Sequence, residues 1–483
     1  MLQYIIYKTI LYFNMFIIVY VTIVSVTNGI QMIISMISTP AYLRKAKFSD
    51  INLYSKSDNM VPISILVPAY NEEPTIVESI KSLLSLNYLT YEVVVINDGS
   101  SDGTLNAVIN AFNLKKITYP IRHKIGVNGK VHGVYYNPEF PSLRLVDKEN
   151  GGKADALNTG INVSRYPYFA SIDADSLLDS DALIRIAMSF MEYKYTIAVG
   201  GMVRVANGSR IENGKIVKLE LPKKSVARFQ IVEYFRAFLV GRVGWSVFNS
   251  LLIISGAFGA FQKDAVLKVG GYTTGTIGED MELVLKLHKY MRKMKYKYKI
   301  SFLPDPICWT QAPESIKNLY GQRRRWHIGL IDSLSRNREM FLNPKFGMLG
   351  VLAMPYYFFF EVMGPLVEAL GLVIIPISYF FGLLSVEFFI LFFMVTTIFG
   401  VILSVGALAI EEYTFNKYTK LSDVFILSLY SILENFGYRQ MTVIFRLAGI
   451  IRYNKYKHAW GKMKRQEFSA TEPTHSHFKN APQ

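Results

Sequence analysis

The sequence predicts an α/β protein in which a soluble domain lies between apolar helices that cross a membrane. Two stretches, residues 9–43 and 388–410, contain no Asp, Glu, Lys or Arg, and about 20 apolar residues are enough to cross a bilayer. Between them the composition is that of a soluble domain, and short apolar runs alternate there with helical patterns. This alternation is typical of a parallel sheet that helices cover on both faces.

The N-terminal apolar stretch predicts a retained membrane anchor over residues 1–47. It is too long for a signal peptide and shows no evident small-residue cleavage site. Arg44, Lys45 and Lys47 follow it directly, so the positive-inside rule places this end in the cytoplasm, together with the domain that follows. The single cysteine, Cys308, excludes an intramolecular disulfide.

Five apolar runs predict the strands of the soluble domain, which we assign to residues 55–340. They are residues 63–67, 92–96, 143–146, 168–172 and 197–201. The motifs PAYNEE, NDGSSD and DAD each follow the carboxyl end of one of these strands, where parallel α/β sheets bind their ligands. No G-x-G-x-x-G follows the first strand, which counts against a dinucleotide cofactor.

The DAD motif places Asp173 and Asp175 directly after the 168–172 strand. On an extended segment, side chains two residues apart point the same way. Their hard carboxylate oxygens would suit Mg²⁺ or Mn²⁺ beside the phosphates of a substrate. Taken alone, the motif is explained equally well by an Asx turn and a helix N-cap.

Two further motifs are weak when each is taken alone. Asp98 in NDGSSD could accept a hydrogen bond from a base or a ribose, but ordinary turn chemistry is the better explanation of that motif by itself. The sequence Gly-Gly-Lys, which ends at Lys153 before a helical pattern, resembles a phosphate contact.

The motifs GED and QRRRW each have a structural and a functional interpretation. Glu279 and Asp280 could be first-turn acids that the helix dipole favours, or Asp280 could be a general base. The arginines and Trp326 could anchor a helix at a membrane interface. Alternatively, Arg325 could bind a diphosphate while Trp326 stacks beneath a sugar ring.

Taken together, the ordered motifs resemble those of membrane-embedded family 2 glycosyltransferases. The motifs are PAYNEE, NDGSSDGT, NGGKADALN, DAD, SGAFGAF, GED and QRRRW, and they extend over residues 60–340. The resemblance is strongest to processive synthases of poly-N-acetylglucosamine, chitin oligosaccharide, hyaluronan and cellulose. It implies a cytoplasmic GT-A (nucleotide-diphospho-sugar transferase) domain, a UDP-sugar donor and a Mg²⁺ or Mn²⁺ ion.

The resemblance also implies a role for individual residues by motif position. Those that hold the uridine would be Pro68, Tyr70, Glu72 and Asp98. Those on the diphosphate side would be Lys153 and Asp173, and the metal ligand would be Asp175. The base that deprotonates the acceptor would be Asp280, with Glu279 beside it at the substrate. The clamp on the diphosphate and acceptor sugar would be Gln322, Arg325 and Trp326. The acceptor path would be lined by Ser255 and Gly256.

Residues 341–412 are expected to form membrane helices, one within 346–386 and one within 388–410. Residues 413–483 would follow as a further helix and a basic tail. We expect the helix over 421–452 to lie at the membrane interface, because charged residues interrupt it, although a further crossing remains an alternative.

Glu361 and Glu368 are seven residues apart, so on one helix they would share a face. On that face they would line a polymer channel or lie at the membrane interface.

The leading hypothesis is a multi-pass cell-membrane enzyme that elongates a polysaccharide and exports it. The alternative is transfer of one sugar to a glycolipid acceptor, as in ceramide glucosyltransferases. A non-enzymatic nucleotide-sugar sensor is disfavoured by the intact DAD, GED and QRRRW motifs. The net charge of +16 does not indicate nucleic-acid binding, because basic clusters adjoin the apolar stretches, where they suit anionic lipid headgroups. Whether an accessory membrane subunit takes part is left open.

Overall fold

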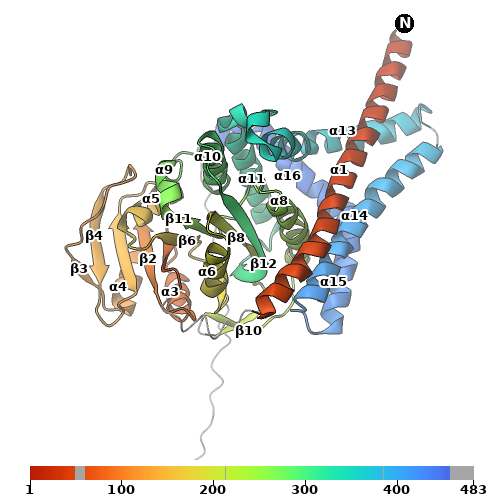
Figure 1. Cartoon of the computed structure of the whole chain (residues 1–483). Coiled ribbons are helices and arrows are strands. Elements are labelled where there is room, and N and C mark those ends of the chain that lie inside the picture. The colour runs from red at the N-terminus through yellow and green to blue at the C-terminus, as the bar shows by residue number, and fades with distance from the viewer. Residues whose placement is uncertain (49–59, 213, 385, 457–483) are drawn as a thin grey trace, which may run out of the picture.

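The computed structural model describes residues 1–48, 60–212, 214–384 and 386–456 of the chain (Figure 1). Within them, one ten-stranded sheet forms the centre of the soluble domain. From edge to edge its strands are β3 (Lys115–Ile117), β4 (Val131–Tyr136), β5 (Leu143–Lys148), β2 (Tyr91–Asp98), β1 (Ile63–Ala69), β6 (Tyr168–Ile172), β11 (Phe258–Gln262), β8 (Thr196–Val205), β12 (Lys299–Thr310) and β7 (Leu177–Leu178). A separate hairpin is formed by β9 (Arg210–Glu212) and β10 (Lys215–Lys218).

The five predicted strands correspond to β1, β2, β5, β6 and β8, and the first four of these run parallel side by side. The prediction of a purely parallel sheet is wrong, because β11 inserts antiparallel between β6 and β8. Strands β3 and β4 at one edge and β7 at the other are antiparallel to their neighbours as well. The chain leaves the sheet after β8 and passes through a hairpin and several helices, so that β11 re-enters from the opposite end.

Helices pack against the sheet. The helices of the soluble domain are α3 (Ile76–Leu84), α4 (Thr104–Ala111), α5 (Lys153–Val163), α6 (Ala182–Glu192), α7 (Ser225–Phe235), π-helix η1 (Arg236–Arg242), α8 (Val243–Val247), α9 (Lys263–Lys268), α10 (Glu279–Lys293) and α11 (Ile316–Arg336). Of these, α5, α10 and α11 carry residues of three predicted motifs. Helix α5 packs on β1 and β2, and α6 packs on β8 and β12.

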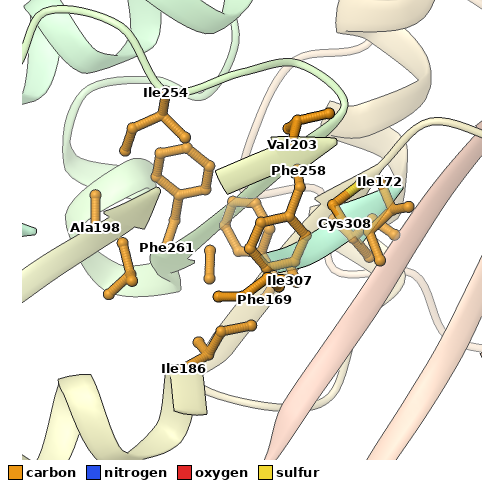
Figure 2. Packing of buried hydrophobic residues seen from close by; sticks show 14 of the residues in the cluster. Phe169, Ile172, Ile186, Ala198, Val203, Ile254, Phe258, Phe261, Ile307 and Cys308 are labelled. Atoms are coloured by element: carbon orange, nitrogen blue, oxygen red, sulfur yellow. The ribbon is translucent and has the colours of Figure 1, made fainter. Parts of the chain in front are cut away.

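Part of the apolar core lies around β6 and β11 (Figure 2). The rings of Phe169 on β6 and Phe261 on β11 stack with their centroids 5.5 Å apart. Ile186 on α6 and Ile307 on β12 are fully buried in the same cluster. This packing holds the end of β6 firmly, and the DAD motif begins at the next residue.

Two of the described helices are long and apolar enough to cross a membrane. They are the segment Tyr7–Lys45 of α1 (Leu2–Phe48) and the segment Phe389–Thr414 of α14 (Val386–Thr414). A third crossing is present if Leu349–Val362 and Gly364–Phe380 count as one bent span. Figure 1 shows α1 and α14 at one end of the molecule, with β3 and β4 at the other.

The structure corrects the expected helix over 346–386. The chain there bends by 42° between Leu349–Val362 and α13 (Gly364–Phe380). Glu361 and Glu368 lie on opposite sides of this bend, so they are not on one continuous helix, yet both face α16 (Arg439–Ile451). There Glu361 pairs with Arg446 at 2.9 Å and Glu368 with Arg439 at 3.4 Å.

The structure also divides the expected interfacial helix over 421–452. It consists of α15 (Leu421–Leu433) and α16 (Arg439–Ile451), joined by the segment η6 (Glu434–Tyr438), in which Gly437 has a φ of 101°. Helix α16 packs on α11 and α13, whereas α15 packs on α14 and α7. A final short helix, α17, covers Tyr453–Tyr456.

Buried ion pairs connect the membrane helices to the soluble domain. Arg204 at the end of β8 pairs with Glu411 of α14, and both side chains are buried. Asp305 of β12 accepts Arg185 at 2.6 Å and also the hydroxyl of Tyr42 on α1. These contacts fix α1 and α14 against the sheet. The predicted start of the soluble domain at residue 55 and the predicted basic tail beyond residue 456 lie outside the described residues.

Candidate functional site

Hydrogen bonds join the turns that follow β1 and β2. Asn71 of PAYNEE has a positive φ of 56°, and its side chain accepts the Ser101 N–H at 2.8 Å. The next residue, Glu72, donates its N–H to the Thr104 hydroxyl at 2.9 Å. PAYNEE and NDGSSD therefore form one continuous edge, as the positions of their strands predict.

The four residues predicted to hold a uridine differ in exposure. Tyr70 is 50% exposed and Pro68 is partly exposed, whereas Glu72 and Asp98 are buried. The Glu72 carboxylate accepts the Thr75 hydroxyl at 3.2 Å within its own turn. The Tyr70 ring is therefore accessible at this edge of the sheet, whereas the Glu72 side chain stabilises the turn in which it lies.

Asp98 is the last residue of β2, and its carboxylate faces protein donors. Its Oδ1 accepts the Lys148 ammonium at 2.7 Å and the Gly151 N–H at 3.0 Å, and its Oδ2 accepts the Gly152 N–H at 2.8 Å. The side chain therefore joins the end of β2 to the Gly-Gly-Lys turn. Lys148 was not among the predicted residues, and its only sequence signal is a lysine that ends an apolar strand.

Lys153, the first residue of α5, points across the sheet edge toward the DAD motif. Its ammonium forms an ion pair with Asp173 and donates to the Gly256 carbonyl at 3.2 Å. It also lies 3.7 Å from the Glu279 carboxylate. Lys153, the predicted diphosphate contact, therefore lies next to acidic side chains from two motifs, DAD and GED.

The DAD motif does not continue the strand, so the argument from an extended segment is wrong. Strand β6 ends at Ile172, and Ala174 and Asp175 form a turn that the Ser176 N–H closes by donating to the Asp173 carbonyl at 3.0 Å. Both aspartates are partly exposed. The turn brings Asp173 to Lys153 and leads into β7 at Leu177.

Gly256 connects the predicted acceptor path to the predicted base. Its N–H donates to Asp280 Oδ2 at 2.8 Å, and Asp280 Oδ1 accepts the Met281 N–H at 2.8 Å. A Cβ on Gly256 would lie 3.0 Å from the Lys153 ammonium and 3.2 Å from Asp280 Oδ2. Ser255 closes the turn before β11, because its carbonyl accepts the Phe258 N–H at 3.0 Å.

Glu279 is a buried acid at the centre of this group. Burial raises the pKa of its carboxyl from 4.5 to about 8, because desolvation of the charged form outweighs the opposing effect of Lys153, and Asp280 adds to the rise. Its Oε2 is buried without a hydrogen-bond partner among the described residues. At neutral pH the protonated form of Glu279 is therefore favoured.

The GED turn is held by α11. Thr276 donates its hydroxyl to Asp332 at 2.6 Å, and Ser333 donates its hydroxyl to the Gly278 carbonyl at 3.1 Å. The backbones approach closely here, since a Cβ on Gly278 would lie 2.7 Å from the Gly329 carbonyl. The position of Asp280 at the start of α10 thus depends on α11.

The QRRRW motif lies on α11, the helix that holds this turn. Gln322, Arg325, Trp326 and Gly329 have the i, i+3, i+4, i+7 spacing that places side chains on one stripe of a helix. Gly329, at one end of this stripe, touches Gly278 of the GED turn, whereas the Trp326 ring lies 6.4 Å from the Tyr234 ring of α7, measured between centroids. Trp326 is 51% exposed, so its ring is accessible.

Arg323 of the same motif points elsewhere. It is buried, pairs with Glu233 of α7 at 2.7 Å, and lies with its guanidinium 4.3 Å from the Trp326 ring centroid. Tyr438 donates its hydroxyl to the same Glu233 carboxylate at 2.8 Å. Residues two apart on a helix lie on nearly opposite sides, so the helical period alone predicts that Arg323 and Arg325 point in different directions.

The carboxylates of the DAD turn fit a hard divalent cation. Asp173 and Asp175 offer oxygen ligands of the type that Mg²⁺ and Mn²⁺ prefer. In the described parts of the chain, no group of three or more His, Cys, Asp or Glu side chains is arranged to hold a metal ion. A cation here would therefore need oxygens from a bound substrate, which is usual for magnesium beside phosphates.

Comparison with known proteins connects these motifs to one family. The family model Glycosyl transferase family 2 matches residues 64–230, and the model Glycosyl transferase family group 2 matches residues 168–403. Poly-beta-1,6-N-acetyl-D-glucosamine synthase of Staphylococcus epidermidis is 31% identical over 300 residues, which are 61% of this chain and 61% of the relative. The enzyme of the same name in Staphylococcus aureus strain COL is 31% identical over 64% of this chain and 62% of its own. The chain thus spans about three-fifths of the length of the curated relatives it matches.

Among solved structures, the mannosyltransferase PcManGT from Pyrobaculum calidifontis, in complex with GDP-Man and Mn²⁺, is similar with a TM-score of 0.49 at 17% identity. The alignment covers 88% of this chain and 98% of that one. The S. aureus TarS structure in complex with UDP-GlcNAc gives a TM-score of 0.35 at 12% identity, over 82% of this chain and 92% of that one. The prediction of an α/β domain flanked by apolar helices is confirmed.

Proposed function

We propose that the chain is a family 2 glycosyltransferase that transfers a sugar from a UDP-sugar to a growing polysaccharide at the membrane, because the models Glycosyl transferase family 2 and Glycosyl transferase family group 2 match residues 64–230 and 168–403. One observation carries this proposal: Gly256 binds the Asp280 carboxylate through its N–H and the Lys153 ammonium through its carbonyl. The motif assigned to the acceptor base and the motif assigned to the donor diphosphate are therefore two hydrogen bonds apart.

On the acceptor side, Asp280 is the proposed general base. Two backbone N–H groups, from Gly256 and Met281, hold one oxygen each and so fix the plane of the carboxylate. A fixed carboxylate can accept the proton of an acceptor hydroxyl as the new glycosidic bond forms. Trp326, exposed on the neighbouring helix, offers a flat apolar face for the acceptor sugar.

On the donor side, Lys153 and Arg325 are the proposed cations for the diphosphate, and Tyr70 offers a ring for the uracil base. Asp175, with Asp173 beside it, would hold a divalent cation, which supplies neutralisation of the diphosphate charge when bound. Release of Lys153 from Asp173 would then leave its ammonium available to the leaving phosphate. We propose that the transfer inverts the anomeric carbon, which requires the base and the leaving diphosphate to lie on opposite sides of the sugar.

UDP-N-acetylglucosamine is the donor we favour, because the curated relatives named above are poly-beta-1,6-N-acetyl-D-glucosamine synthases. The apolar helices α1 and α14 support a multi-pass enzyme, and the basic residues after α1 support a cytoplasmic catalytic domain. A polymer made next to these helices would be exported as it grows. Activity of the purified chain alone in vesicles would show that no accessory membrane subunit is required.

The proposal is tested with the purified full chain in lipid vesicles and a panel of UDP-sugars. Released UDP is measured with Mg²⁺, with Mn²⁺ and with chelator, and the length of the product is measured in the same samples. We expect metal-dependent release from UDP-N-acetylglucosamine and a long polymer. A product of one sugar on a lipid would replace the polysaccharide proposal with glycolipid synthesis, and absence of release from every sugar would contradict enzymatic activity.

A further inference from the structure

Lys148, the last residue of β5, is a fully buried lysine between two carboxylates. Its ammonium lies 2.7 Å from Asp98 Oδ1 and 2.9 Å from Asp155 Oδ2, and it donates to the Glu149 carbonyl at 2.5 Å. All three charged side chains are almost completely inaccessible. A buried charge is costly unless it is paired and hydrogen-bonded, so this arrangement needs all of its members.

The first carboxylate, Asp98, carries the influence of Lys148 to the Gly-Gly-Lys turn. It binds the N–H groups of Gly151 and Gly152, and its backbone carbonyl accepts the Asn150 side chain at 2.8 Å. The turn is tight on both sides. Gly152 has a φ of 86°, and a Cβ on Gly99 would lie 2.6 Å from the Asn150 nitrogen. Three consecutive residues are thus bound to one aspartate.

The second carboxylate, Asp155, lies in the first turn of α5 and binds another loop. It accepts the Asn128 N–H at 2.7 Å and the Gly129 N–H at 3.3 Å. Gly151 packs directly against its side chain, which leaves no room for a Cβ there. Lys148 therefore connects the ends of β2 and β5, the start of α5 and the loop at residues 128–129.

Lys153 directly follows the turn that this network holds. Its backbone position is set by Gly152, and its ammonium reaches Asp173 and the Gly256 carbonyl from there. A displacement of the turn would move Lys153 away from both. Placement errors of about 1 Å at a reacting centre can cost about 100-fold in rate.

We propose that Lys148 is a positioning residue of the donor site, which holds Asp98 and Asp155 so that the Gly151–Gly152 turn presents Lys153 to the donor diphosphate. The inference rests on the proposed function for the role of Lys153. It gives Asp98 a positioning role through its bonds to Lys148 and to the turn. Lys148 itself does not touch the donor.

The chain provides a matched control on the same strand. Arg144 lies four residues before Lys148 and is also a buried cation, paired with the buried Glu92. Glu92 is near the start of β2, whereas Asp98 is at its end, so the two pairs lie at opposite ends of the sheet. Replacing either cation by methionine removes a buried ion pair. After Arg144→Met, Glu92 still pairs with Arg165 at 3.0 Å, and only Lys148→Met disturbs the turn before Lys153.

The test compares the full-length Lys148→Met and Arg144→Met chains with the wild type in vesicles. Three quantities are measured: the donor KM and kcat, the dissociation constant of UDP, and hydrogen exchange of residues 126–130 and 149–156. For Lys148→Met we expect both the donor KM and the UDP dissociation constant to rise about tenfold or more, with faster exchange in both segments. For Arg144→Met we expect changes in these two constants within about twofold.

Asp155→Asn is the second variant, in case Lys148→Met does not fold. It keeps one acceptor oxygen, replaces the other by an NH2 donor and removes one charge, and we expect a rise in the UDP dissociation constant of about threefold. Equal losses of UDP affinity in Lys148→Met and Arg144→Met would overturn the proposal, since they would indicate a general effect on stability. Unchanged exchange over 149–156 in Lys148→Met would overturn it as well. If the wild type transfers no sugar, the proposed function fails, yet the exchange comparison still decides whether Lys148 holds the turn.

Discussion

The backbone N–H of Gly256 binds the carboxylate of Asp280 at a distance of 2.8 Å. The two residues come from different motifs, SGAFGAF and GED, that are more than twenty positions apart in the chain. The carbonyl of the same glycine accepts the Lys153 ammonium at 3.2 Å. A single peptide group thus sets the spacing between the proposed base and the proposed diphosphate contact, and this relationship underlies the predictions that follow.

Gly256→Ala should lower turnover by about tenfold or more while the fold is retained. The added Cβ would lie 3.0 Å from the Lys153 ammonium and 3.2 Å from Asp280 Oδ2, so both side chains must shift. The measurement is kcat/KM for the donor together with the melting temperature. Gly126→Ala is the control, because a Cβ there meets no atom within 4 Å. Equal activity of the two variants would contradict the proposed spacing.

The neighbouring arginines of QRRRW should behave differently when each is replaced by methionine. Arg323→Met removes the charged partner of Glu233, which keeps only the Tyr438 hydroxyl in a largely buried site, and should destabilise the fold by about 3 kcal/mol. Arg325→Met should leave the melting temperature nearly unchanged and reduce turnover by about 100-fold. Thermal unfolding in detergent and UDP release measure the two effects. The assignment is wrong if Arg325→Met is the variant that unfolds.

Glu279 should make stability depend on pH. The pKa of its carboxyl is raised by burial from 4.5 to about 8, so the folded state binds its proton more tightly than the unfolded state. Its stabilising contribution is complete below pH 4.5 and is lost as the pH rises toward 8. We expect the melting temperature of the wild type to fall across this range, and Glu279→Gln to reduce the slope. The same slope in both proteins would exclude Glu279 as its source.

Removing one partner of the Arg204–Glu411 ion pair should destabilise the chain more than replacing both partners. Arg204→Met leaves a fully buried carboxylate on α14 unpaired and should destabilise the chain by about 3 kcal/mol. The double variant Arg204→Met and Glu411→Leu removes that charge and should recover a large part of the loss. Melting temperatures of the two single variants and the double variant give the coupling. Additive losses would show that the two side chains act independently.

The sequence was informative where local pattern and tertiary structure agree. Strands β1, β2, β5, β6 and β8 were predicted because both of their faces are covered, which makes them continuous apolar runs. The polar motifs that follow them were correctly placed on one edge. The direction of β11 could not be predicted, because it depends on the path of helices between residues 225 and 247.

Within the site, the types of residue were easier to predict than their partners. Asp173 and Lys153 were both singled out, but their ion pair depends on a turn at Asp175 that the strand pattern does not indicate. Asp98 was assigned to a uridine, whereas its carboxylate binds Lys148 and two glycine N–H groups. Pairings of this kind are set by strand register and by helix docking, which a single sequence does not report.

The central claim, that this chain makes polysaccharide with Asp280 as its base, is tested most directly by comparing two aspartate variants. Asp280→Asn keeps the size of the side chain and one of its two accepted hydrogen bonds but removes the basic carboxylate, whereas Asp264→Asn changes an exposed aspartate of α9. Both full-length chains are given UDP-N-acetylglucosamine and Mg²⁺ or Mn²⁺ in vesicles, and polymer is measured. The account predicts loss of polymer by about 100-fold or more in Asp280→Asn, with UDP still bound, and wild-type polymer in Asp264→Asn. Polymer at the wild-type rate from Asp280→Asn would contradict it.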